Sequence, residues 1–353
     1  MVTVSSRSRR TPEVAVAGTY LPPTLLADVH LLDVLELSGS QQAAACFLDL
    51  HQSTVSRSLR SLQLQLQLQS GLRSAACRLG RNHCLDLLRL AARAHRNMSG
   101  VLRLSTDNLH QSLLQERAAL QPVPSRFRRL DDWADLIRLG LLDGAITSSE
   151  GLEKHPSPGE EPRWNRLRLV PLGHLSLQLM ACTPHVQGVL LPSRAITPLL
   201  HQRLERQGYR IVIQPMAAHE PDAWLKRLRD RQLAVPLCPA LQGAAWLREQ
   251  GLLLLPQQPA WQEKLWLLLP APSSNPEHLD PSPSGLDAAT PAHRSEPQTA
   301  QPRRAELQPA RPPALTALER DVVRHLRRRL QRATRQDAQW QENQASCSWS
   351  TTK

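Results

Sequence analysis

The sequence predicts an α/β protein that begins with a small helical domain. Between residues 25 and 66, apolar residues recur at helical spacing, with breaks at 38–40 and 49–51. From residue 100 to residue 270, short apolar runs alternate with amphipathic segments, which is typical of α/β folds. The chain has 353 residues, which is enough for two domains with packed cores.

Composition favours a polyanionic partner. The formal net charge is +12, so we expect the surface to attract nucleic acid first and anionic membrane second. The six cysteines form no CxxC pair, which argues against a disulfide framework or a zinc ribbon and favours a reduced, cytoplasmic compartment. No apolar run approaches the roughly 20 residues of a membrane-spanning helix. We therefore expect no membrane association, metal or cofactor.

The N-terminal domain is expected at residues 24–82, after a flexible basic arm at 1–23. Its helices should begin near Leu25, cover Gln41–Leu48, and run from Gln52 to Leu64. Three short helices in this length are typical of a helix-turn-helix unit. The alternating Leu and Gln of 62–69 indicates a helix end that leads into a wing.

The segment from Ala44 to Leu62 resembles the helix-turn-helix of LysR-type transcription regulators. Its pattern of Ala-Ala, Leu, a turn, Gln, Val-Ser, an apolar residue and Leu matches that family. Ala44 and Ala45 are small enough for two helices to cross closely, and Val55 lies on the apolar side of the third helix. The resemblance implies a winged helix-turn-helix whose third helix enters the major groove of double-stranded DNA.

Carried over position by position, the resemblance assigns DNA contacts to the polar face of the third helix. Base edges would be read by Gln52, Thr54 and Arg57, with Arg60 as a second long cation, and the DNA backbone would be held by His51, Ser53 and Ser56. The wing departs from the family, because Gln63 replaces Glu, Gln67 replaces Gly and Ser70-Gly71 replaces Leu-Phe. Arg73 retains the basic position of the wing and implies a phosphate contact.

A connecting helix is expected at residues 83–99. Leu85, Leu88 and Ala92 lie at helical spacing and favour pairing with the same helix of a second chain. We therefore expect a homo-oligomer, either a dimer or a tetramer.

The α/β domain is expected at residues 100–270. Strands are predicted at 101–105, 143–147, 167–170, 175–181, 188–191, 210–213, 233–237 and 265–269, and helices at 109–120, 131–139, 197–207, 222–230 and 241–250.

Three stretches of this domain resemble the LysR effector-binding domain, a pair of lobes like those of periplasmic binding proteins. They are Gly100–Ser105, Leu139–Ile146 and Arg168–Gly173. The resemblance implies a small-molecule effector between the lobes, contacted by residues at strand ends, namely Ser105, Thr106, Thr147 and Ser148. Isolated Ser and Thr residues are also common helix caps. The family has a glycine-rich turn where this chain has Arg229–Gln232, so effector sensing is altered or lost in this reading.

The C-terminal extension divides into two segments. Residues 271–314 are rich in Pro, Ser, Ala and Gln, which predicts a disordered linker. Leu315–Arg335 is helical and basic within a tail at 315–353, and is either a further polyanion contact or a solvated helix.

These observations together predict a DNA-binding regulator of LysR type that responds to a small effector. One alternative is a constitutive DNA-binding protein whose α/β domain only oligomerises. Another is a two-lobed binding protein or enzyme with a decayed helix-turn-helix. The sequence has no GxxxxGK[ST], GxSxG or HExxH motif, so we expect no catalytic residues.

Overall fold

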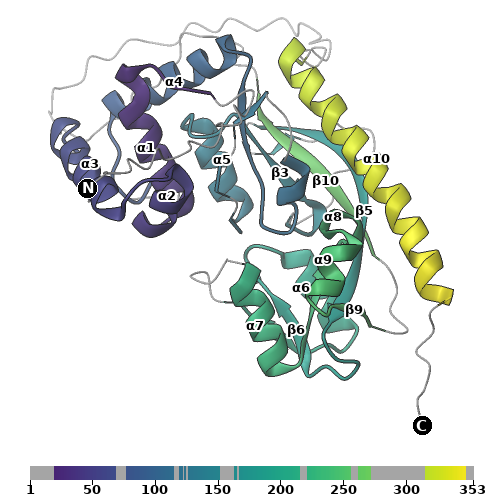
Figure 1. Ribbon diagram of the computed structural model, residues 1–353. Coiled ribbons are helices and arrows are strands. Elements are labelled where there is room, and N and C mark those ends of the chain that lie inside the picture. Colours follow the sequence, from purple (N-terminus) through teal and green to yellow (C-terminus); the bar gives the residue numbers. More distant parts are fainter. Residues whose placement is uncertain are drawn as a thin grey trace, which may run out of the picture.

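The computed structural model places a group of four helices beside a two-lobed α/β body, with a long C-terminal helix along the far side (Figure 1). It describes residues 20–68, 77–114, 119–121, 123–124, 126–151, 163–164, 167–214, 221–255, 261–271 and 315–346. The predicted class, an α/β protein with an N-terminal helix-turn-helix, is confirmed. The tip of the predicted wing, 69–76, lies outside the described residues.

The N-terminal group consists of α1 (Thr24–Ser38), α2 (Gln41–Leu48), α3 (Gln52–Gln65) and α4 (His83–Met98). All four agree with the sequence predictions to within a few residues. Gly39 ends α1 in the left-handed conformation, at φ 75°, which favours glycine because it lacks a Cβ. The helices share one apolar core formed by Val29, Leu32, Val34, Leu35, Ala44, Ala45, Val55, Leu59, Leu62 and Leu85.

One sheet runs through both lobes. Lobe I contains β2 (Leu120–Gln121), β1 (Leu102–Ser105), β3 (Gly144–Ser148), β10 (Trp261–Pro270) and the first part of β5 (Leu167–Ala181). Lobe II continues from the end of β5 through β8 (Leu233–Leu237), β6 (Gly188–Leu191) and β7 (Ile211–Ile213). The short strands β4 (Arg163–Trp164) and β9 (Leu253–Leu254) pair with β5. Strand β5 therefore joins the two lobes.

Helices cover the sheet in both lobes. Lobe I has η1 (Gln111–Leu114), α5 (Leu130–Arg138) and η2 (Ser149–Gly151), and lobe II has α6 (Pro198–Arg206), α7 (Pro221–Arg231) and α9 (Ala244–Glu249). The short α8 (Pro239–Gln242) contacts η1 and α10 and packs in the lobe I core. The α5 helix packs its apolar side against β3 and β10, as expected for a strongly amphipathic segment.

The prediction of two separate strands at 167–170 and 175–181 is wrong, because β5 is continuous. Pro171 pairs opposite Trp266, Gly173 pairs opposite Leu265, and the intervening register shift is a bulge. A bulge accommodates a residue without an N–H donor and lets the ladder resume beyond it.

The predicted helix at 109–120 is also wrong. Asp107 accepts hydrogen bonds from the backbone N–H groups of Leu109 (2.8 Å) and His110 (3.1 Å), which starts a turn and then η1. The chain next joins β1 in parallel as β2. The predicted helix at 241–250 is divided into α8 and α9 by Gly243, at φ 84°.

The last helix, α10 (Ala317–Ser346), lies along β5 (Figure 1). Thr316 and Glu319 cap its start reciprocally, with the Glu319 N–H donating to Thr316 Oγ1 and the Thr316 N–H donating to Glu319 Oε2. Val322, Leu326 and Leu330 are buried in the lobe I core. The apolar face of this helix is therefore not solvated. The linker was predicted at 271–314, and all of it beyond residue 271 lies outside the described residues.

Candidate functional site

The helix-turn-helix is formed by α2, a three-residue turn and α3. Ser40 caps α2 by accepting a hydrogen bond from the Ala43 N–H at 3.1 Å. Asp49 ends α2 in the left-handed conformation, at φ 53°. His51 then caps α3, because its Nδ1 accepts from the Ser53 N–H at 3.3 Å. Both ends of the turn are thus fixed by local hydrogen bonds.

The outer face of α3 carries most of the predicted DNA contacts. His51, Gln52, Ser53, Arg57 and Arg60 are exposed. The Arg57 Nε donates to the Ser53 carbonyl at 3.3 Å, which lays the side chain along the start of the helix.

The remaining predicted contacts of this domain are less accessible. Thr54 and Ser56 are partly buried at the edge of the same face. Arg73 lies outside the described residues. The helix from Gln52 to Gln65 contains no acidic residue, so its outer face combines amides, hydroxyls and two cations without a repelling carboxylate.

A buried ion cluster joins α1 to the α/β body. Asp33 of α1 is fully buried and accepts from Arg89 Nε of α4 at 2.8 Å and from Arg103 Nη1 of β1 at 2.9 Å. Burial lowers the pKa of Arg89, but Asp33, Cys77 and Glu36 together raise it by more, and the net shift is upward. Since a buried charge is costly without a partner, Asp33 ties α1 to β1, and α1 packs against the helix-turn-helix.

His30 extends this cluster as a neutral acceptor. Burial, together with the charge of Arg103, lowers the pKa of His30 to about 4. Arg103 Nη2 donates to His30 Nδ1 at 2.8 Å, and the uncharged imidazole suits this role.

A second buried carboxylate, Asp143, precedes β3. Its two oxygens accept from Arg96 Nε and Nη2, both at 3.0 Å, and Oδ2 also accepts from the Arg103 N–H at 2.7 Å. This bidentate pair fixes the end of α4 against lobe I.

The sequence patterns did not reveal these buried charges, although one signal was present. Arg89 and Arg96 are spaced seven residues apart and share a helix face with Leu85 and Ala92, and all four are buried. The face of α4 that contains Leu85 and Ala92 was predicted to pair with a second chain, but it is buried inside this chain. The predicted pairing face is therefore wrong.

The end of α1 is held by a second set of contacts. Arg126 Nη1 donates to the Ser38 carbonyl at 3.3 Å, and Arg128 Nη2 donates to the Leu37 carbonyl. Carbonyls at a helix C-terminus lack intrahelical donors, so these two guanidinium groups satisfy them. Residues 126–128 thus hold the end of α1, which packs against the helix-turn-helix, and this segment is named the clasp below.

The predicted effector residues lie at the inner ends of β1 and β3. Thr106 Oγ1 donates to the Ile146 carbonyl at 3.2 Å, and Ser148 Oγ accepts from the Glu150 N–H at 3.0 Å. Ser105 and Thr147 are buried, and Ser105 Oγ has no hydrogen-bond partner among the described residues. Of the four, Ser148 lines a small cavity of about 30 Å³.

That small cavity, the polar cleft, contains charged side chains from the chain itself. His110 lies between Asp107 and Glu263, with its Nδ1 2.9 Å from Asp107 and its Nε2 3.0 Å from Glu263. Burial lowers the pKa of His110, but the two carboxylates raise it well above the usual value. Glu150 of lobe I also faces Arg203 of lobe II at 3.2 Å. The lobes are therefore closed over the polar cleft.

The described residues contain no cluster of three or more potential metal ligands. Within the same residues, no helix has both the length and the apolar character needed to cross a membrane.

Comparisons with known proteins give fold likenesses only. No protein-family model and no curated protein matches the chain. ArgP from Mycobacterium tuberculosis is 19% identical, with 71% of this chain and 91% of that chain covered and a TM-score of 0.37. An H₂O₂-bound cysteine-to-serine mutant of Corynebacterium glutamicum OxyR is 15% identical, with 91% and 98% covered and a TM-score of 0.41. CbnR in complex with its target DNA is 13% identical, with 86% and 99% covered and a TM-score of 0.39. Likenesses this weak assign neither a ligand nor an activity to this chain.

Proposed function

We propose that this protein is a divergent LysR-type transcription regulator that recognises double-stranded DNA through α3. The observation that carries this proposal is the outer face of α3. Its polar side chains are exposed while Val55, Leu59 and Leu62 are buried on the opposite side. Amides and arginines on such a face can read base edges in the major groove.

Within this proposal, the residues have different roles. Gln52, Thr54 and Arg57 contact base edges, whereas His51, Ser53 and Ser56 contact the DNA backbone. Arg60 and Arg73 add phosphate contacts.

We further propose that the protein acts as a homodimer paired through α4. Leu87, Leu90 and Met98 are exposed on one side of this helix and follow helical spacing, at 43%, 37% and 86% exposure. They lie on a different face from the buried Leu85 and Ala92. An exposed apolar stripe on a helix is a common pairing surface.

A constitutive DNA-binding protein is the second candidate. The closed polar cleft favours it, because the predicted effector residues line at most a cavity of about 30 Å³. A drug-sized ligand needs roughly ten times that volume.

Substitution of Arg57 tests the proposal. Arg57→Ala should weaken binding to a selected DNA site by about 5- to 150-fold and binding to random DNA much less, since a base-edge arginine contributes about 1–3 kcal/mol of discrimination. Arg194→Ala provides a control, because Arg194 is an exposed arginine near α6 in lobe II. Equal losses on both DNAs would reduce Arg57 to a phosphate contact, and no loss on either would refute the role of α3.

A further inference from the structure

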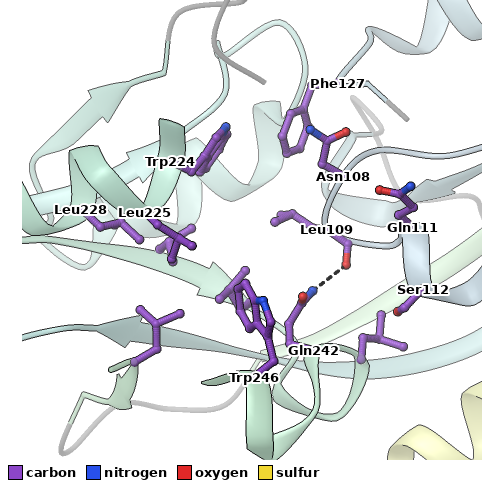
Figure 2. Close-up of a pocket in the computed structure, with 14 residues that line it drawn as sticks. Asn108, Leu109, Gln111, Ser112, Phe127, Trp224, Leu225, Leu228, Gln242 and Trp246 are labelled. Carbon is purple, nitrogen blue, oxygen red and sulfur yellow. Dashed lines mark hydrogen bonds between the residues drawn. The ribbon is translucent and has the colours of Figure 1, made fainter. Parts of the chain in front are cut away.

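A second cavity between the lobes is larger than the polar cleft. It shares Leu109, Phe127 and Trp224 with the polar cleft, but the charged residues of that cleft do not line it. Its volume is about 290 Å³. Figure 2 shows Trp224 and Leu225 of α7 on one side, Asn108, Gln111 and Ser112 opposite, and Trp246 below them. None of the four predicted effector residues lines this space, which we call the aromatic cavity.

The lining is aromatic and uncharged. Phe127 and Trp224 stack across the lobes, with ring centroids 5.3 Å apart. No Asp, Glu, Lys, Arg or His is among the described residues that line the cavity. A charged ligand would lose its hydration here without gaining a partner, so the lining favours a neutral molecule with a π face.

Two buried polar atoms on the walls lack hydrogen-bond partners among the described residues. They are Ser112 Oγ and Trp224 Nε1. The indole N–H is a donor only, and the hydroxyl can also donate. Gln242 is already engaged, because its Nε2 donates to the Leu109 carbonyl at 3.0 Å (Figure 2). The ligand that best satisfies these atoms carries a hydrogen-bond acceptor.

The volume limits the size of that ligand. An apolar cavity of roughly 150 Å³ can hold benzene. The aromatic cavity has about twice that volume, which suits two fused rings.

The clasp connects this cavity to the helix-turn-helix. Phe127 is on the cavity wall, while its neighbours Arg126 and Arg128 hold the carbonyl groups at the end of α1. Three consecutive residues therefore contact both the cavity and the DNA-binding unit. A shift of Phe127 on ligand binding would move the two guanidinium groups.

From these observations we propose that the aromatic cavity binds a neutral bicyclic aromatic molecule bearing a hydrogen-bond acceptor, and that the clasp transmits this binding to α1. Occupancy of the cavity is independent of the function proposed above. Its effect on DNA affinity rests on that function.

Titration calorimetry of the full chain with coumarin, a neutral bicyclic lactone, tests the site directly. We expect saturable binding at one site per chain. Ser112→Ala should weaken it about three- to tenfold through loss of one hydrogen bond, and Trp246→Ala at least tenfold through loss of the ring. Trp261→Phe, on β10 away from the cavity, should bind as the wild type does. The carboxylate 2-naphthoate, of similar size, should bind at least tenfold more weakly than coumarin.

Three results would overturn the site: no coumarin binding, binding that both cavity variants leave unchanged, or equal affinity for 2-naphthoate. Each can occur while DNA binding is intact, so failure of the site is distinct from failure of the proposed function. Coumarin should also change affinity for a selected DNA by at least threefold, and Arg126→Ala should abolish that change while retaining coumarin binding. An unchanged DNA affinity with coumarin bound would refute transmission through the clasp.

Discussion

Asp33→Asn should detach the helix-turn-helix from the α/β body. Asp33 is the carboxylate shared by Arg89 and Arg103, which are 0% and 1% exposed. Asn has nearly the same shape but no charge, so two buried guanidinium groups lose their counter-ion. Removing one partner of a buried ion pair typically costs about 3–5 kcal/mol. Asp28→Asn is the matched control, since Asp28 is an exposed aspartate on the same helix, and it should change stability by no more than about 0.5 kcal/mol.

Urea unfolding followed with two probes separates the loss of the N-terminal helices from the unfolding of the α/β body. The first tryptophan in the sequence is Trp133, so none lies in α1 to α4 and the fluorescence reports mainly on the α/β body. Trp133 also shares a core cluster with Leu37 of α1 and contributes a smaller signal from that contact. Far-ultraviolet circular dichroism reports on α1 to α4 as well. We expect the two transitions to coincide in the wild type and in Asp28→Asn. In Asp33→Asn, part of the helical signal should be lost at lower urea, before most of the fluorescence change. If the Asp33→Asn and Asp28→Asn curves coincide in both probes, the ion cluster does not hold the domains together.

Three further predictions concern other parts of the fold. His110 has a raised pKa, so its ion pairs stabilise the protein fully below the unfolded-state pKa of about 6.5, and that contribution is lost as pH rises through the folded-state pKa. In thermal melts, the wild type should therefore lose stability above pH 6.5 relative to His110→Gln. Parallel pH profiles of the two proteins would contradict this. Gly39→Ala should destabilise the protein by more than Gly208→Ala does. Both glycines have positive φ, but a Cβ at Gly39 would lie 1.5 Å from Arg126 Nη1, whereas nothing lies within 4 Å at Gly208; equal losses in urea unfolding would show that Arg126 moves aside freely. Leu326→Ala should cost about 2–5 kcal/mol, because Leu326 is fully buried between α10 and the lobe I sheet; a loss below 1 kcal/mol in the same assay would mean that α10 contributes little to the core.

Sequence patterns predicted the helix-turn-helix well because its signals are local. Ser40 and Gly39 set helix boundaries within a few residues, and Ala44 and Ala45 mark the helix crossing. The polar face of α3 follows from the same periodicity, which is why its exposed residues were found without a structure.

Sequence patterns did not predict the features that depend on contacts between distant parts of the chain. Two strands were predicted at 167–170 and 175–181, yet β5 is continuous. A bulge at Leu172, between Pro171 and Gly173, lets β5 keep its pairing with β10, and β10 lies about 90 residues away in the sequence. The role of Asp33 was missed for a similar reason, since its partners are 56 and 70 residues distant. The C-terminal helix was predicted as a polyanion contact or a solvated helix, because nothing in its local pattern shows that its apolar residues pack against the lobe I core and β5.

The affinity of the protein for specific DNA tests the central proposal most directly. We would select bound fragments from a randomised duplex pool at fixed salt and measure the affinity of the enriched sequence against random DNA. A dimer that inserts two copies of α3 predicts an inverted repeat with half-sites about one helical turn apart, bound at least 1,000-fold more tightly than random sequence. If no sequence is enriched, or if the same sequence is enriched by a chain that lacks residues 1–70, α3 does not read DNA and the proposed function is wrong.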